Sequence, residues 1–245
     1  MVAAYRLEWG SEGLTALAPT SSVIIIVDVL RFSTAVCCAL ESNITVLPYR
    51  WHDETTGGYA RAHDAVVAGR RELGELSLSP TDLLSAPAGV RLVLPSPNGS
   101  TLAFAAQEYG ASHVLAGCIR NASAVAVAAR RLAGGGSIAI VAAGERWNTH
   151  DGPLRVAVED LLGAGAILAA LDPAGAVSAP RCSPEAAAAR AAFVSTRPLI
   201  HDALANSTSG IELVGRGWAD DVATAAAYDV STVVPVLVGN EFRRA

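Results

Sequence analysis

The 245-residue chain contains no lysine, so all 18 of its basic residues are arginine. A Walker A phosphate-binding loop, a Schiff-base enzyme and a pyridoxal phosphate enzyme each need a lysine, and these classes are therefore excluded. Aromatic residues make up only 5% of the chain, whereas hydrophobic residues make up 51%. The core is thus filled mainly by alanine, valine and leucine, which favours helices packed closely on a parallel sheet.

Long apolar runs are also missing, because none reaches the ~20 residues that a membrane-spanning helix needs. The first residues do not show a charged segment followed by an apolar core, so we expect no signal peptide. The net charge is −5 and no basic stripe is present. These features predict a cytoplasmic protein with no nucleic acid and no membrane as partner.

Paired cysteine motifs are absent as well. The four cysteines, Cys37, Cys38, Cys118 and Cys182, show no CxxC spacing. We therefore expect free, mostly buried thiols and no zinc site.

Short apolar runs alternate with segments of helical pattern along most of the chain. The predicted strands are Val23–Val27, Ile44–Leu47, Val90–Leu94, His113–Ala116 and Ser137–Ala142. The predicted helices are Ser33–Leu40, His52–Ala68, Thr101–Tyr109, Ala122–Leu132, Val156–Leu171, Pro184–Ala192, Leu199–Asn206 and Asp220–Tyr228. This alternation predicts an α/β fold with a mostly parallel sheet between helical layers.

The length suits either one large α/β domain or two small intertwined ones. No linker divides the chain cleanly, so residues 1–245 are expected to form a single compact unit, whether or not it contains two interlocked subdomains. The sequence leaves open whether the chain forms a homodimer.

Polar side chains follow the first predicted strand, Val23–Val27. Asp28, Arg31, Ser33 and Thr34 all emerge there, immediately before or within a predicted helix. Asp28 suits a hard cation, and Arg31 suits a phosphate or sulfonate. The alternative is an ordinary core strand that ends in a helix cap, and this segment alone does not decide between the two.

Further polar groups follow three other strands. Asn98, Gly99 and Ser100 form a glycine turn before a helix, where backbone N–H groups can bind an anion. The alternative is a simple turn. Asn121 follows the next strand, and its alternative role is that of a helix cap.

The remaining polar groups are acidic. Glu145 follows the last predicted strand, and Glu159 and Asp160 open a long helix. Acidic residues in a first helical turn also interact favourably with the helix dipole without any ligand. The carboxyl ends of parallel strands share one edge of a sheet, and we therefore expect all four groups to meet there.

Such a cluster would combine Asp28, Glu145, Glu159 and Asp160 with the guanidinium of Arg31. Oxygen ligands beside a phosphate-binding surface are typical of a Mg²⁺ site. The reaction that fits best is metal-assisted hydrolysis of a phosphate ester, in which the cation clamps the phosphate oxygens.

The same motifs resemble the 2-phosphosulfolactate phosphatase family, the magnesium-dependent phosphatases of coenzyme M biosynthesis. The resemblance extends from about residue 20 to 238 and is carried by Val27–Ala35, Ser96–Ser100, Gly117–Ala122, Ala143–Glu145, Glu159–Gly165 and Asp229–Pro235. It implies an α/β fold of two similar, interlocked subdomains. It also implies hydrolysis of the small anionic phosphorylated substrate 2-phospho-3-sulfolactate to 3-sulfolactate and phosphate.

The resemblance also suggests roles for individual residues. The expected Mg²⁺ ligands are Asp28, Glu159 and Asp160. The expected catalytic residues are Asp28, Arg31 and Glu145. The expected substrate-binding residues are Arg31, Ser33, Thr34, Asn98, Gly99, Ser100 and Asn121.

One segment, 69–80, departs from the family pattern. Arg70 stands where the family usually has glutamate, and Leu78 stands where it has asparagine. The sequence therefore leaves a second hypothesis open, a non-catalytic or altered-specificity relative that binds an anionic metabolite. A third, a structural scaffold, predicts neither metal nor anion binding.

Overall fold

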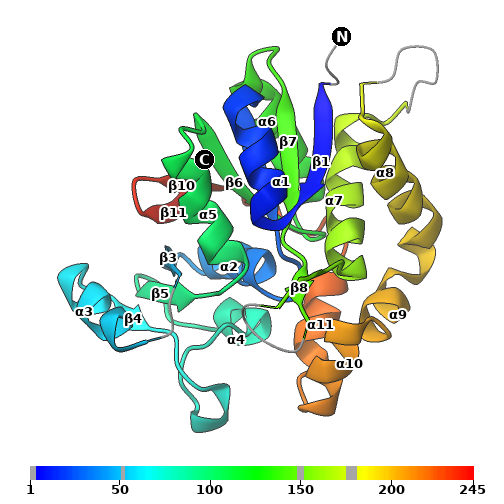
Figure 1. Ribbon diagram of the computed structural model, residues 1–245. Coiled ribbons are helices and arrows are strands. Elements are labelled where there is room, and N and C mark those ends of the chain that lie inside the picture. Colours follow the sequence, from blue (N-terminus) through cyan, green and yellow to red (C-terminus); the bar gives the residue numbers. More distant parts are fainter. Residues whose placement is uncertain (1–3, 51–52, 148–151, 175–180) are drawn as a thin grey trace.

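The computed structural model describes residues 4–50, 53–147, 152–174 and 181–245. Within these residues nine strands form one sheet, in the order β1-β7-β2-β6-β10-β11-β3-β5-β4, and helices cover both of its faces (Figure 1). The strands are β1 Tyr5–Trp9, β2 Val23–Val27, β3 Thr45–Tyr49, β4 Val66–Val67, β5 Arg91–Pro95, β6 His113–Gly117, β7 Ile138–Ala142, β10 Pro235–Val238 and β11 Glu241–Arg244. The predicted α/β fold with a mostly parallel sheet is confirmed.

The helices are α1 Gly10–Leu17, α2 Phe32–Glu41, α3 Glu54–Ala62, α4 Pro80–Leu84, α5 Gly99–Glu108, α6 Ala122–Ala133, α7 Val158–Leu171, α8 Pro184–Thr196, α9 Ile200–Ala205, α10 Thr208–Gly215 and α11 Ala219–Ala226. A short ribbon of β8 Glu145–Arg146 and β9 Leu154–Arg155 follows the sheet strand β7. No helix in the described part of the chain is long and apolar enough to cross a membrane.

The sheet consists of two parallel segments joined by an antiparallel hairpin. Strands β1, β7, β2 and β6 are parallel to one another, as are β3, β5 and β4. The hairpin β10–β11 pairs antiparallel with β6 on one side and with β3 on the other. The chain therefore enters the first segment, crosses to the second, returns to the first, and finally fills the gap between them.

This topology corrects one expectation. The pairing makes β5 run opposite to β2, so the strand end before Asn98 does not share a sheet edge with the strand end before Asp28. The two ends nevertheless meet, since the Gly99 N–H donates to Asp28 Oδ2 at 3.0 Å. A twisted sheet of this width brings the two segments into different orientations, with β1 and β7 upright and β5 lying across in Figure 1.

Strand β2 shows why both sheet faces are covered. All five of its residues are buried, with Val23, Ile25 and Val27 in one hydrophobic cluster and Ile24 and Ile26 in another. Side chains alternate between the two faces of a strand, so a continuous apolar run indicates helices on both sides.

Small residues allow the helices to approach closely. A Cβ built on Gly165 of α7 would lie 2.2 Å from the carbonyl oxygen of Ala189 in α8. The alanine- and glycine-rich composition is thus used in backbone-to-backbone packing of α7 against α8. All four cysteines are buried and free, as predicted.

Some elements of the structure were predicted with wrong bounds, and others were not predicted. The predicted helix His52–Ala68 instead ends at Ala62 and is followed by β4, while its first residue, His52, lies outside the described residues. The elements β1, α1, α10 and the β10–β11 hairpin were not predicted.

Candidate active site

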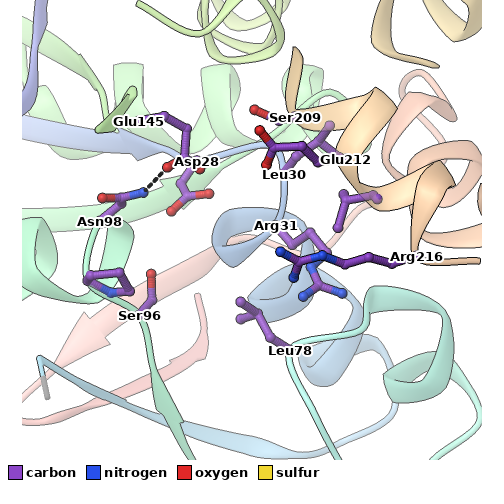
Figure 2. Close-up of a pocket in the computed structure, with 12 residues that line it drawn as sticks. Asp28, Leu30, Arg31, Leu78, Ser96, Asn98, Glu145, Ser209, Glu212 and Arg216 are labelled. Carbon is purple, nitrogen blue, oxygen red and sulfur yellow. Dashed lines mark hydrogen bonds between the residues drawn. The ribbon is translucent and has the colours of Figure 1, made fainter. Parts of the chain in front are cut away.

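A pocket of about 200 Å³ opens between the carboxyl ends of β2 and β5 and helix α10 (Figure 2). It is lined by Asp28, Leu30, Arg31, Leu78, Ser96, Pro97, Asn98, Glu145, Ser209, Glu212, Leu213 and Arg216. Four of the predicted site residues, Asp28, Arg31, Asn98 and Glu145, therefore lie at one cavity. Asp28 and Glu145 lie on one side in Figure 2, and Arg31 faces them from the other.

Asp28 is fixed by backbone hydrogen bonds from two helix starts. Its Oδ1 accepts from the Phe32 N–H at 3.1 Å, and its Oδ2 accepts from the Gly99 N–H at 3.0 Å. Burial nevertheless raises the pKa of Asp28 to about 7, and the negative charges of Glu145 and Glu159 add to this rise, against the effect of the two hydrogen bonds. The side chain can therefore exchange a proton near neutral pH.

Gly99 permits this contact because it has no side chain. A Cβ at this position would lie 2.2 Å from Cδ1 of Phe32 and 2.9 Å from Asp28 Oδ2. Any other residue would push the start of α5 away from Asp28.

Two more carboxylates lie behind Asp28, in the first turn of α7. Asp160 accepts from the Val29 N–H at 2.7 Å and from the Gly144 N–H at 2.9 Å. Burial raises the pKa of Asp160 well above its ordinary value, and the charges of Asp28 and Glu159 raise it further. Neither Glu159 nor Asp160 is among the residues that line the pocket.

Glu145 contributes from the short strand β8. Asn98 precedes α5 without capping it and instead donates from Nδ2 to Glu145 Oε2 at 3.0 Å (Figure 2). Burial raises the pKa of Glu145 despite this bond and the nearby charge of Arg155. Asn98 thus ties the acidic wall of the pocket to the second sheet segment.

The acidic residues offer the kind of ligand atom that a hard divalent cation prefers. Their ligand atoms are all carboxylate oxygens, and Glu159 Oε2 is buried with no hydrogen-bond partner among the described residues. Across the described ranges, however, no three His, Cys, Asp or Glu side chains are already arranged as a metal site. The Mg²⁺ ion and its ligands remain a prediction.

The basic wall of the pocket is held by Asp221, which is fully buried at the start of α11. Arg31 donates from Nη1 to Asp221 Oδ2 at 2.8 Å, and Ser79 Oγ donates to Asp221 Oδ1. Arg71 lies 3.3 Å from the same carboxylate. The Arg31 guanidinium also stacks 4.7 Å from the ring centre of Trp218.

The other predicted substrate-binding side chains are buried and bonded to backbone groups. Ser33 Oγ donates to the Ile26 carbonyl, Thr34 Oγ1 to that of Val29, Ser100 Oγ to that of Leu94, and Asn121 Nδ2 to that of Val233. Asn121 precedes α6 but makes no side-chain capping bond. These residues do not line the pocket, and their contact with substrate stays a prediction.

Helix α10 and Arg216, the residue that follows it, supply pocket residues that the sequence did not reveal. Ser209, Glu212, Leu213 and Arg216 recur at spacings of three and four, which places them on one helix face. Ser207 begins this helix by accepting from the Gly210 N–H at 3.0 Å. The serine cap and this spacing could have predicted the helix, though not its position at the pocket.

The segment that departs from the family pattern also reaches the site. Leu78 lines the pocket, and Arg71 pairs with both Asp82 and Asp221. Residues 69–80 are therefore part of the wall around Arg31.

Comparison with known proteins shows the family of this chain. The family model described as 2-phosphosulpholactate phosphatase matches residues 12–240. The chain belongs to the 2-phosphosulfolactate phosphatase family. It is thus placed among phosphoric monoester hydrolases.

Two relatives in this family match over most of their length. The "2-phosphosulfolactate phosphatase" of Methanothermobacter thermautotrophicus is 33% identical over 220 residues, covering 88% of this chain and 87% of that protein. The "Probable 2-phosphosulfolactate phosphatase" of Thermus thermophilus is 32% identical over 224 residues, covering 89% of this chain and 88% of that protein.

Proposed function

We propose that this protein hydrolyses 2-phospho-3-sulfolactate to 3-sulfolactate and phosphate, in a Mg²⁺-dependent reaction. The observation that carries the proposal is the divided pocket, which has Asp28 and Glu145 on one wall and Arg31 on the other. The names of the family and of the two relatives support this substrate.

The residues of the pocket suit phosphate ester hydrolysis. Arg31 uses one nitrogen for Asp221 and has further N–H groups for a phosphate oxygen. Without a bound cation the pKa of Asp28 is raised to about 7, so the site favours neutralisation of this carboxylate, which a bound cation would provide. Asn98 and Glu145 fix each other beside Asp28.

Mg²⁺ would be held by Asp28 together with Glu159 and Asp160. It would supply positive charge to the phosphate oxygens. The buried, unpartnered Oε2 of Glu159 supports this assignment, as do the raised pKa values of Asp28 and Asp160, which follow first from burial and then from the neighbouring negative charges.

The proposal is tested by measuring phosphate release from 2-phospho-3-sulfolactate with Mg²⁺, with EDTA, and after Mg²⁺ is restored. We expect release that stops with EDTA and returns with the ion. Release that is unaffected by EDTA would refute the metal dependence, and no release from this substrate would refute the activity.

A second candidate function is anion binding without turnover. The altered segment 69–80 favours it, because Leu78 lines the pocket where the family usually has asparagine. Saturable binding of 3-sulfolactate in calorimetry, with no phosphate release from any small phosphate ester, would establish this function in place of hydrolysis.

A further inference from the structure

Two arginines stack on the same tryptophan at the edge of the pocket. The guanidinium carbon of Arg31 lies 4.7 Å from the ring centre of Trp218, and that of Arg216 lies 5.5 Å from it. Both arginines line the pocket, and Figure 2 shows them on the side of it away from Asp28. Stacking on an aromatic face fixes the plane of a guanidinium and leaves its N–H edge free.

The two arginines differ in how their charge is balanced. Arg31 is paired with buried Asp221, whereas the guanidinium of Arg216 makes no hydrogen bond or ion pair with any residue that the structure describes. Glu212 lies one turn earlier on the same helix, lines the same pocket and makes no ion pair with Arg216 there. An exposed arginine next to another cation, with no anion of its own, is suited to an anionic group of a ligand.

The other arginines near the site do not offer such a group. Arg71 is paired with Asp82 and Asp221, and Arg120 is buried and paired with Glu41. Arg155 donates to Ser209 Oγ and does not line the pocket. Among the arginines that line the pocket, Arg216 is therefore the one without a protein anion.

We propose that Arg216, held against Trp218, binds the sulfonate of the substrate and so determines specificity for a sulfonated phosphate ester. The inference rests on the proposed function, which supplies a substrate with phosphate, carboxylate and sulfonate groups. Asp28 and Glu145 give the pocket a negative wall, and this wall repels a substrate that carries three anionic groups. The free guanidinium of Arg216 lies opposite that wall. It binds the sulfonate, which does not react, and so holds this group away from the acidic residues.

The test compares Arg216→Gln with wild type on two substrates, 2-phospho-3-sulfolactate and 2-phospholactate, which lacks the sulfonate. We expect kcat/KM for the sulfonated substrate to fall roughly 10- to 100-fold, mainly through KM, because one charge-assisted contact is lost. The value for 2-phospholactate should stay within about threefold. Arg216→Lys should give an intermediate loss, since it keeps the charge but not the planar fork.

Arg197→Gln is the matched control. Arg197 is also exposed and also stacks on an aromatic ring, that of Tyr228, but it does not line the pocket. This variant should match wild type on both substrates. An equal loss on both substrates in Arg216→Gln, or no loss on either, would overturn the inference.

A binding measurement separates this inference from the proposed hydrolysis. Calorimetric titration of wild type and Arg216→Gln with 3-sulfolactate and with lactate needs no turnover. Sulfolactate binding that weakens roughly 10-fold or more in the variant supports the sulfonate contact even if wild type releases no phosphate. Equal affinity in both proteins would refute the contact even if hydrolysis is observed.

Discussion

At the scale of single residues, Asp28 joins two helix starts to the acidic wall of the pocket. It accepts hydrogen bonds from the starts of α2 and α5, and it lies in the electrostatic field of Glu145 and Glu159. Since its pKa is raised from 3.8 to about 7, the folded protein holds a proton at Asp28 more tightly than the unfolded chain does. Stability should therefore depend on pH.

Below about pH 4 this carboxyl is protonated in both the folded and the unfolded chain, and its full contribution to stability is present. The contribution is lost as the pH rises from about 4 to about 7, and its size is on the order of 4 kcal/mol. Thermal melts in EDTA between pH 5 and 8 should show a falling midpoint in wild type. Asp28→Asn, which cannot ionise there, should show a shallower fall, and identical slopes would contradict the raised pKa.

Gly99 gives a second prediction at this scale. In Gly99→Ala the new Cβ would lie 2.2 Å from the Phe32 ring and 2.9 Å from Asp28 Oδ2, so the helix start must move. We expect phosphate release to fall at least about 10-fold because the hydrogen bond to Asp28 is lost. Gly215→Ala is the control, since a Cβ there meets no atom within 4 Å. Wild-type activity in Gly99→Ala would show that the contact is not needed.

The sequence predicted a site residue well where a side chain suited to the chemistry also lies near the end of a predicted strand. Asp28, Arg31, Asn98 and Glu145 each lie shortly after the end of a sheet strand, and all four line the pocket. The hydroxyl of Ser33 was harder to interpret, because serine at a strand end serves a ligand or the backbone equally well. In the structure it bonds to the Ile26 carbonyl.

At the scale of elements, the site depends on contacts between segments far apart in the chain. The start of α11, the 69–80 segment and the start of α2 meet at Asp221, which binds Arg31, Ser79 and Arg71. No local pattern indicates this meeting, because Asp220 and Asp221 are also the ordinary acidic residues of a first helical turn.

Replacement of Asp221 by Asn should loosen Arg31. The change leaves Arg31 without a carboxylate partner and leaves Arg71 with Asp82 alone, in a largely buried setting, at a cost of about 3 kcal/mol in the free energy of unfolding. We expect KM for the phosphorylated substrate to rise several-fold, measured by steady-state kinetics. The exposed neighbour variant Asp220→Asn should change neither KM nor stability, and an unchanged KM in Asp221→Asn would show that Arg31 is positioned without it.

At the scale of the whole molecule, the β10–β11 hairpin unites the two parallel sheet segments. Its Phe242 is fully buried, faces Val46 of β3 and packs edge-on against Phe32, with ring centres 6.0 Å apart. The backbone N–H of Phe32 in turn donates to Asp28, so the hairpin supports the site through its contact with Phe32. The hairpin's pairing with β6 and β3, which are distant in sequence, could not be predicted from local periodicity.

Phe242→Ala should therefore lower the free energy of unfolding by about 3–5 kcal/mol, as expected for a large aromatic side chain removed from a core. Urea unfolding monitored by circular dichroism measures this change. Val238→Ala in the same hairpin is the control, because Val238 is half exposed and should cost less than about 1 kcal/mol. Equal small losses in both variants would mean that the hairpin is not a structural link.

The hydrolytic role of the pocket is tested most directly by replacing Asp28. We predict that Asp28→Asn lowers phosphate release from 2-phospho-3-sulfolactate by about 100- to 10,000-fold at saturating Mg²⁺, while the circular dichroism spectrum stays that of the folded protein. Asp202→Asn, which removes an equal charge from an exposed position, should keep wild-type activity. Undiminished phosphate release by folded Asp28→Asn would contradict the assignment of this pocket as the active site.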